Sequence, residues 1–324
     1  MGVAAGTAVL PAALISPASA SAHDSDRDRH RPARPLVIGH RGASGHRPEH
    51  TLASYTLAIE LGADFIEPDV VPTADGVLVA RHENEISGTT DIAQRPELAD
   101  RRTVKEVDGR RKEGWFTEDL TLAELRTLRA RERLPELRGT AFDGRFGIPT
   151  LEEVIALAAS AGVGVYPETK HPSYFAGLGL ALEEPLLAAL EGFGGPVFIQ
   201  SFEAGNLRAL RSRTDHPLVR LTVGTAPDVA EIAGYADAIG PHKDQVIPRT
   251  RDGRLGAPSS LVADAHAAGL LVHPWTFRPE APFLPAGLDG DAELDRFLAL
   301  GVDGVFADDP GAAVAARSRA ARPR

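Results

Sequence analysis

The chain has 324 residues, is 43% hydrophobic and 25% charged, and has a formal net charge of −10 at pH 7. This length suits one large domain or two of medium size, and the acidic balance argues against a general nucleic-acid binder, which would carry a basic face. The sequence has no cysteine, which excludes disulfides, thiolate catalysis and Cys-ligated zinc. A core of this size folds without disulfides, so the missing cysteine leaves the cellular compartment open.

Residues 2–22 are apolar and small and end in the sequence ASA. This composition is typical of the hydrophobic core and cleavage site of a secretory signal. No Lys or Arg precedes the apolar run, so either the signal begins upstream of Met1 or the segment is not a signal. The Pro and Ser content and the short apolar core argue against a transmembrane anchor. We expect a signal peptide at 1–22, a flexible charged lead-in at 23–34, and a secreted or periplasmic protein.

From Pro35 onward, short β-rich apolar runs alternate with Ala/Leu-rich helical patterns, several of which close on Gly, a common helix C-cap. This alternation implies a parallel sheet. About eight strands in roughly 280 residues predict an α/β TIM (β/α)8 barrel over residues 35–317. A doubly wound sheet is the alternative, but no Gly-rich nucleotide loop follows the first strand. The strand candidates are PLVIGH, DFIEPDVV, GVLVARH, GVGVYPETK, PVFIQSF, LVRLTV, ADAIGPH, LLVHPWTF and GVDGVFADD.

Polar residues stand at the end of one predicted strand after another, as in barrels that build their active sites at the C-terminal ends of the strands. They are His40, Arg41, Glu67, Asp69, Glu168, Lys170, Gln200, His242, Lys243, His273, Trp275 and Asp308. Residues 85–147 break the rhythm because they are long, charged and poorly periodic. We expect them to form a small inserted subdomain after an early strand, with a helix at 121–131.

Three carboxylates indicate a metal site. Glu67 and Asp69 are two residues apart on a strand, so both side chains point to one face. Two carboxylates there repel unless a cation lies between them, although the pair alone is equally consistent with a solvated strand end. Glu168 ends the next clear strand, and the three converge if the sheet closes. Oxygen-only ligands suit a divalent cation such as Ca²⁺ or Mg²⁺, while nearby histidines leave a transition metal open.

Two histidines, His40 and His82, also follow predicted strands. A lone histidine there is more often a satisfied polar residue than a catalyst, but on a barrel both would flank the metal site as general base and general acid. Arg41 and Lys170 add positive charge, and guanidinium matches phosphate oxygens bidentately. A metal, cations and two histidines without a thiol predict phosphoryl transfer or phosphodiester cleavage.

Weaker signals come from Glu49, before the first helix, and Trp275, at a late strand end. Glu49 either supports a metal ligand or histidine from behind or only favours the helix dipole. Trp275 either lines a substrate pocket or packs in the core. Several histidines have no assignment and are expected to be structural or uninformative: His46, His50, His216, His242, His266 and His273.

The motifs together resemble the glycerophosphodiester phosphodiesterase family, over nearly the whole chain after Pro35. They are HRGASGHRPEHT, GADFIEPDVVPTADGVLVARHE, YPETK, FIQSF, VHPWTF and GVDGVFADDP, in the order that the family shows. The PEHT form and the long insertion are most similar to the secreted or periplasmic bacterial branch. The resemblance implies a TIM barrel with an insertion at about 85–147.

The resemblance also implies roles for individual residues. A divalent metal, Ca²⁺ or Mg²⁺, would be held by Glu67, Asp69 and Glu168. Acid–base catalysis would fall to His40 and His82, and phosphate contacts to Arg41 and Lys170, with Glu49 nearby. Trp275 is predicted to bind substrate from its place at a late strand end alone.

The implied reaction is hydrolysis of glycerophosphodiesters, such as glycerophosphocholine, to glycerol 3-phosphate and an alcohol. In related enzymes the glycerol 2-hydroxyl attacks internally and a cyclic phosphate forms. FRPEAPFLP after Trp275 is richer in proline than the family pattern, which leaves the contacts to the alcohol open. We expect a small-molecule substrate, no nucleic acid and no stable membrane insertion. The headgroup, the metal, the acid and base assignment and the oligomeric state stay open.

Two other functions compete with this reading. A phospholipase D-like enzyme on the same barrel would cleave lysophospholipids or sphingolipids and would need an apolar rim for acyl chains, whereas the predicted insertion is charged. A non-catalytic phosphodiester-binding protein could keep the same fold. The complete set of histidines and carboxylates argues against it.

Overall fold

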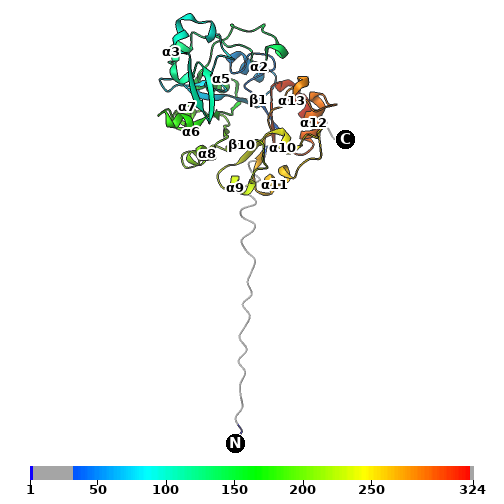
Figure 1. The fold of residues 1–324 in the computed structure, drawn as a ribbon. Coiled ribbons are helices and arrows are strands. Elements are labelled where there is room, and N and C mark those ends of the chain that lie inside the picture. The colour runs from blue at the N-terminus through cyan, green and yellow to red at the C-terminus, as the bar shows by residue number, and fades with distance from the viewer. Residues whose placement is uncertain (3–31, 322–324) are drawn as a thin grey trace. The chain divides into compact units, whose positions relative to one another are not determined.

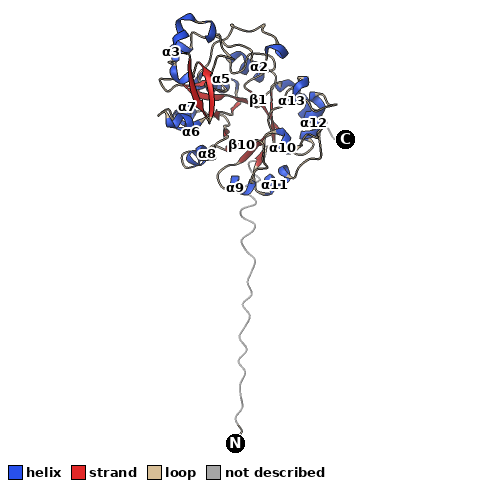
Figure 2. Cartoon of the chain, in the orientation of Figure 1, coloured by secondary structure: helices blue, strands red, loops and turns tan. Residues whose placement is uncertain are grey.

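The structure is a computed structural model that describes residues 1–2 and 32–321. The predicted signal peptide and most of the predicted lead-in lie outside these residues. In residues 32–321 the strands occupy the centre and the helices lie around them (Figures 1 and 2). Within the described part of the chain, no helix has both the length and the apolar character needed to cross a membrane.

Within residues 32–321, eight parallel strands form the central wall, and two of them are broken at a proline. Pro68 separates β2 from β3, and Pro167 lies between β7 and β8, because proline has no N–H to donate to the ladder. The strands of this wall are β1 (Leu36–His40), β2 (Phe65–Glu67) with β3 (Asp69–Pro72), β7 (Gly164–Val165) with β8 (Glu168–Thr169), β9 (Ile199–Ser201), β10 (Leu218–Thr222), β11 (Ala238–Pro241), β12 (Leu271–Val272) and β13 (Gly304–Ala307).

The strands run in the orders β13-β1-β2-β7 and β12-β11-β10-β9-β8-β3. The two broken strands connect one run to the other. At the remaining seam, the backbone N–H of Asp303 donates to Val272 (2.9 Å) and that of Phe306 donates to Pro274 (3.1 Å). The chain therefore has the predicted TIM-barrel fold.

The strand register brings the polar strand ends to one level. His40 is the partner of Glu67 across β1 and β2. Asp69 is the partner of Glu168, and Glu168 is the partner of Gln200. Residues far apart in the chain are thus neighbours at one end of the barrel.

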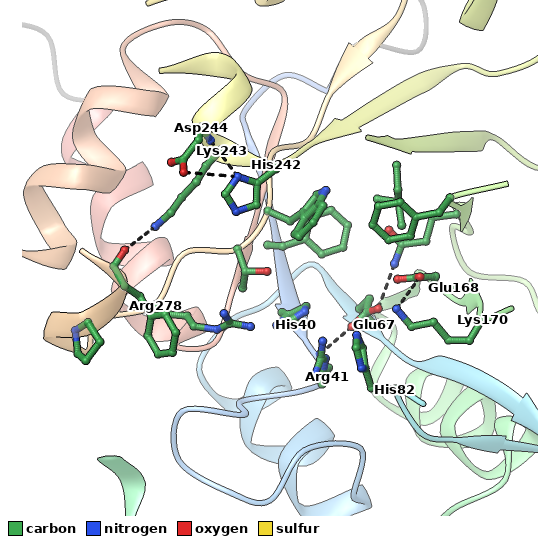
Figure 3. A pocket seen from close by; sticks show the side chains of 18 of the residues that line it. His40, Arg41, Glu67, His82, Glu168, Lys170, His242, Lys243, Asp244 and Arg278 are labelled. Carbon is green, nitrogen blue, oxygen red and sulfur yellow. Dashed lines mark hydrogen bonds and ion pairs between the residues drawn. The ribbon is translucent and has the colours of Figure 1, made fainter. Parts of the chain in front are cut away.

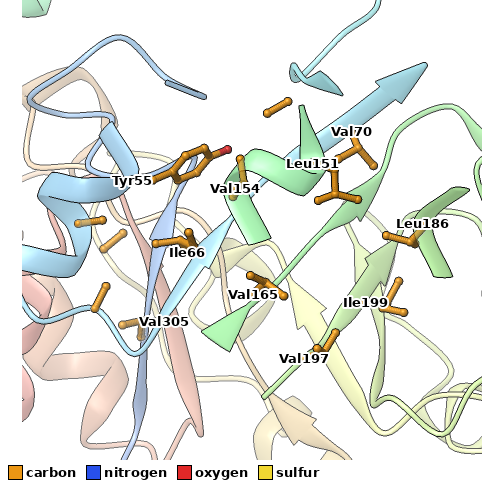
Figure 4. Packing of buried hydrophobic residues seen from close by; sticks show 14 of the residues in the cluster. Tyr55, Ile66, Val70, Leu151, Val154, Val165, Leu186, Val197, Ile199 and Val305 are labelled. Atoms are coloured by element: carbon orange, nitrogen blue, oxygen red, sulfur yellow. The ribbon is translucent and has the colours of Figure 1, made fainter. Parts of the chain in front are cut away.

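The core has two layers, because successive side chains of a strand point to opposite faces. On β1, Val37 belongs to the layer between strands and helices, whereas Ile38 belongs to a cluster inside the barrel. Figure 4 shows part of the outer layer, where Ile66 and Val70 of the wall pack near Val154 of a helix. The inner cluster consists of Ile38, Phe65, Tyr166, Phe198, Val219, Ala238, Leu271 and Phe306.

Helix ends follow local capping rules. Thr51 caps the first helix by accepting from the Ser54 N–H, as expected for a polar residue there. Thr150 and Glu153 form a capping box, and Gly162 ends that helix in the left-handed region (φ 68°). The α-helices around the barrel are α2 (Leu52–Glu60), α5 (Leu151–Ala161), α6 (Pro172–Gly177), α7 (Glu183–Leu190), α8 (Ala204–Arg211), α9 (Val229–Ile232), α10 (Lys243–Val246), α11 (Leu261–Ala267), α12 (Gly290–Leu298) and α13 (Pro310–Ala320).

One predicted strand differs from the others. β4 (Leu78–Ala80), within the GVLVARH run, pairs antiparallel with β3 and does not belong to the parallel wall. It turns back after β3 at Thr73, whose backbone N–H donates to Val77. His82 therefore reaches the barrel mouth from a hairpin.

Segment 85–147 lies between β4 and α5. The predicted helix at 121–131 is shorter, because after Arg126 the backbone turns to pair with residues 90 and 91. The elements of the segment are η2 (Ile92–Gln94), η3 (Pro96–Arg101), the hairpin β5 (Thr103–Val107) and β6 (Arg110–Gly114), η4 (Thr117–Asp119), α3 (Leu122–Leu125) and α4 (Pro135–Arg138); a further 3-10 helix, η5 (Ala281–Phe283), follows β12.

Candidate active site

A cavity of about 330 Å³ lies at the barrel mouth and gathers most of the predicted site residues (Figure 3). Glu67, Glu168 and Lys170 lie along one side, with His40, Arg41 and His82 beside them. The other side carries aromatic and charged residues of the later strands and loops. The residues that line the cavity include His40, Arg41, Glu67, His82, Glu168, Lys170, Gln200, Phe202, His242, Lys243, Asp244, Arg249, Trp275, Arg278, Phe283 and Phe306.

Glu67, Asp69 and Glu168 form a buried carboxylate cluster whose ligand atoms all lie within 4.8 Å of one another. β2 ends at Glu67 and β3 begins at Asp69, so the break at Pro68 keeps both side chains at the mouth. The Glu67 carboxylate accepts from the Arg41 backbone N–H (2.7 Å) and from the Gln200 amide (3.0 Å). The predicted convergence of three carboxylates is present in the structure.

The electrostatics of this cluster fit a bound cation. Burial, Asp69 and Glu168 raise the pKa of Glu67 well above its usual range. Burial also raises the pKa of Glu168, to about 8, although Lys170 opposes the shift. The protein's own groups therefore do not keep all three acids ionised at neutral pH. A divalent cation would favour the ionised forms, and oxygen donors alone suit Ca²⁺ or Mg²⁺. The residues could hold such an ion.

Asp69 differs from its two neighbours. Burial alone would raise its pKa, but Lys170, His50 and Arg41 together hold the pKa well below its usual range. Its Oδ1 accepts no hydrogen bond within the described residues, and the Lys170 ammonium lies 3.2 Å away. Asp69 Oδ1 is therefore an oxygen of an ionised carboxylate that could bind a cation.

Arg41 and Lys170 place positive charge beside the acids. Lys170 Nζ lies 2.6 Å from Glu168 Oε1. Arg41 is held in a left-handed backbone conformation (φ 59°) just after β1. Its guanidinium donates to Glu49 Oε2 at 2.9 Å. Glu49, predicted to support a metal ligand or histidine or only to favour the helix dipole, contacts Arg41 in the structure.

His40 ends β1 and points into the cavity beside Phe306 (Figure 3). Its Nδ1 lies 2.6 Å from Asp308 Oδ1. Burial and Arg41 lower the pKa of His40 to about 4, although Asp308 opposes the shift. In the free protein the imidazole therefore favours its neutral form. Asp308 then accepts from Nδ1–H, which leaves Nε2 as the nitrogen able to take a proton.

His82 follows β4 and reaches the same cavity from the hairpin. Its Nδ1 contacts Glu83 Oε2. Burial, Arg41 and Lys170 lower the pKa of His82, while Glu83 opposes the shift. Both histidines therefore have one ring nitrogen on a carboxylate, and both line a cavity shared with the acid cluster.

Trp275 lines the same cavity. Its indole N–H donates to the Gly240 carbonyl (2.8 Å), and its ring lies edge-on to Phe202 and His242. Three cationic residues that line the cavity are paired with acidic side chains. Lys243 pairs with Glu293, Arg249 with Asp244, and Arg278 with Asp308.

Several residues of the site had no role in the sequence analysis. His50, taken there as uninformative, is fully buried, and its Nε2 lies 2.9 Å from Asp69 Oδ2 while Nδ1 lies 2.7 Å from the Tyr55 hydroxyl. Its position right after Glu49 was the available signal. Arg133 and Arg138 of segment 85–147 also contact carboxylates of the site. The sequence did not predict this, because nothing in their local sequence marks them.

The chain is similar to known phosphodiesterases. Residues 40–312 match the glycerophosphoryl diester phosphodiesterase family. A glycerophosphodiester phosphodiesterase of Arabidopsis thaliana is 38% identical over 86% of this chain and 85% of its own length. One from Bacillus subtilis is 31% identical over 92% and 90%.

Solved structures share the fold. A phosphodiesterase from Oleispira antarctica, solved with the product sn-glycerol-3-phosphate, has a TM-score of 0.65 and 23% identity over 88% of this chain and 97% of its own. A glycerophosphodiester phosphodiesterase from Agrobacterium tumefaciens has a TM-score of 0.60 and 22% identity over 87% and 99%.

Proposed function

Because the chain belongs to the glycerophosphoryl diester phosphodiesterase family, and is therefore a phosphodiesterase, we propose that it hydrolyses glycerophosphodiesters such as glycerophosphocholine to glycerol 3-phosphate and an alcohol. The observation that carries the proposal is the common cavity, where His40 and His82 flank a buried carboxylate cluster beside Arg41 and Lys170. Acid–base groups and phosphate-binding cations thus share one site.

In the proposed reaction Arg41 and Lys170 bind the phosphate oxygens. A divalent cation held by Glu67, Asp69 and Glu168 would neutralise negative charge on the phosphate. One histidine takes the proton of the glycerol 2-hydroxyl as that oxygen bonds to phosphorus. The bond from phosphorus to the alcohol oxygen breaks. The other histidine, whose protonated form the bound phosphate anion favours, protonates the departing alcohol.

The products of this first step are the free alcohol and a cyclic glycerol phosphate. Water then opens the ring with the histidine roles reversed. Its hydroxyl bonds to phosphorus, its proton passes to the glycerol 2-oxygen, and glycerol 3-phosphate is released. One water is consumed overall, and both histidines regain their starting protonation.

The histidine roles are tested by His40→Ala and His82→Ala in a coupled assay for glycerol 3-phosphate release from glycerophosphocholine. Each variant should lose roughly 10²–10⁴-fold in kcat, the usual contribution of one acid–base group. His46→Ala is a matched control, because His46 is half-exposed and pairs with Asp309. Wild-type turnover in both cavity variants would show that the assignment is wrong.

The metal is tested by removing divalent ions with a chelator and then adding back Ca²⁺ or Mg²⁺ separately. Activity should fall on removal and return with the ion that the site uses. Full activity in the stripped protein would contradict the metal role.

The rival activity on lysophospholipids gains no support from the cavity. A rim that accepts acyl chains would be apolar, whereas this cavity is lined by the charged residues Lys243, Asp244, Arg249 and Arg278 as well as by aromatic residues. Hydrolysis of glycerophosphocholine should therefore exceed that of lysophosphatidylcholine. A preference for the lysolipid would reverse this conclusion.

We also propose that the protein is exported from the cytoplasm. The proposal rests on the composition of residues 1–22, which resembles a secretory signal. N-terminal sequencing of protein recovered outside the cytoplasm should begin at His23. Recovery only from the cytoplasm, with Met1 intact, would contradict it.

A further inference from the structure

Two arginines of segment 85–147 bind the carboxylates that contact the two cavity histidines. Arg133 and Arg138 lie at either end of the LPEL run, and Arg138 is the last residue of α4. The Arg138 side chain is 8% exposed and that of Arg133 is 27% exposed. Long cationic side chains are rarely this buried unless their charge is paired, so their partners matter.

Arg138 reaches the carboxylate behind His40. Its guanidinium donates to Asp308 Oδ2 (2.6 Å) and to the Ser44 carbonyl (2.8 Å), and it also binds Glu280. The other oxygen of Asp308 lies 2.6 Å from His40 Nδ1. A continuous chain of hydrogen bonds therefore leads from segment 85–147 through Asp308 to His40.

Arg133 reaches the carboxylate behind His82 in the same way. It donates to Glu83 Oε1 (2.7 Å), and the other oxygen of Glu83 contacts His82 Nδ1. It also grips Glu49 with two hydrogen bonds (2.7 and 2.6 Å). Glu49 in turn holds Arg41, so Arg133 supports one histidine and one phosphate-binding cation.

We propose that Arg133 and Arg138 are positioning residues, through which segment 85–147 sets the orientation and tautomer of both histidines. Each guanidinium keeps one carboxylate ionised and fixed. That carboxylate accepts Nδ1–H and leaves Nε2 for proton transfer at the cavity. The inference rests on the proposed function, because it assigns an arginine to each histidine of that reaction.

The competing explanation is that both arginines only fasten segment 85–147 to the barrel. The two explanations differ in chemistry. A fastening role weakens every substrate's turnover alike. A positioning role affects the proton transfer that each histidine carries out. Only one of these transfers, the protonation of the departing alcohol, becomes unnecessary when the substrate has a better leaving group.

The variants Arg133→Met and Arg138→Met are assayed on glycerophosphocholine and on the p-nitrophenyl ester of glycerol 3-phosphate, whose phenolate leaves without a proton. On glycerophosphocholine each should lose roughly 10–100-fold in kcat, the usual effect of losing a group that orients a site residue. In one variant only, the single-turnover rate of p-nitrophenolate release should recover most of that loss. That rate does not include the later ring opening, which uses both histidines. That variant identifies the histidine that acts as the acid.

The two variants should also differ in KM. Arg138→Met leaves Arg41 in place, so KM should stay within about twofold of wild type. Arg133→Met loosens Glu49 and hence Arg41, so KM should rise as well. Arg145→Met is the control from the same segment, because Arg145 lies over Phe142 and faces a different pocket.

Thermal unfolding of each variant shows whether it is folded, and Arg133→Lys and Arg138→Lys replace any Met variant that is not. Wild-type kcat in both variants, or the same loss on both substrates in both, overturns the inference. His40→Ala and His82→Ala are measured on the same substrates. If they too retain turnover, the proposed function fails; if they lose it while the arginine variants do not, only this inference fails.

Discussion

The surroundings of His40 and His82 differ, although the Nδ1 atom of each histidine contacts a carboxylate. Asp308 follows β13 of the barrel wall, its side chain is 2% exposed, and it binds both Arg138 and Arg278. Glu83 follows the antiparallel β4, and its side chain is 23% exposed. Arg133 is its guanidinium partner among the described residues. One contact is thus built into the barrel and the other at its rim.

Because of this difference, we expect the two carboxylates to contribute differently to the stability of the fold and to catalysis. A buried carboxylate that is removed leaves its cations unpaired in a medium of low dielectric constant, which is costly. At the rim, water screens the remaining charge and the cost is small. We therefore expect the His40 side to contribute to both folding and catalysis, and the His82 side to contribute mainly to catalysis.

The largest effect is expected for Asp308→Asn. Arg278 would lose its carboxylate and Arg138 would keep Glu280 alone, so the free energy of unfolding should fall by about 1.5–3 kcal/mol. Turnover should fall roughly 10²–10⁴-fold as the His40 tautomer is lost. Denaturant unfolding and the glycerol 3-phosphate assay measure the two. The control is Asp309→Asn, since Asn caps α13 as well as Asp does. If Asp308→Asn unfolds within about 1 kcal/mol of wild type, the His40 side does not contribute more to folding than the His82 side.

A smaller effect on stability is expected for Glu83→Gln. The free energy of unfolding should change by no more than about 1 kcal/mol, because the pair with Arg133 is partly exposed. Turnover should still fall roughly 10–100-fold, since His82 loses the carboxylate that orients it. Equal destabilisation in Glu83→Gln and Asp308→Asn would show that the rim and the barrel interior do not differ in this way.

The smallest effect is the pH dependence of stability. Burial alone would raise the pKa of Asp308, but His40, Arg278 and Arg138 hold it well below the ordinary 3.8. Its stabilisation is therefore complete above pH 3.8. It is lost as the pH falls below that value, because the unfolded chain takes up the proton first.

Unfolding measured across the acidic range should show this loss in wild type and a shallower slope in Asp308→Asn. An unchanged slope in the variant would mean that Asp308 contributes nothing to acid stability.

The sequence was informative wherever a local pattern fixes the direction of a side chain. Strand periodicity placed Glu67 and Asp69 on one face, and the position of Glu168 at the next strand end completed the cluster. The alternation of strands and helices gave the barrel. The GVLVARH run shows the limit, because strand composition does not tell a parallel strand from the antiparallel β4.

The sequence by itself therefore determined the barrel, the carboxylate cluster and the histidines at its mouth, since each depends on the spacing of residues within one element. Only the tertiary structure decided what holds the histidines. Asp308 is 268 residues from His40, and Arg138 is 170 residues from Asp308. Closure of the barrel places β13 beside β1, and the path of segment 85–147 brings Arg133 and Arg138 to the mouth. Such contacts depend on how elements pack together, which no local periodicity records.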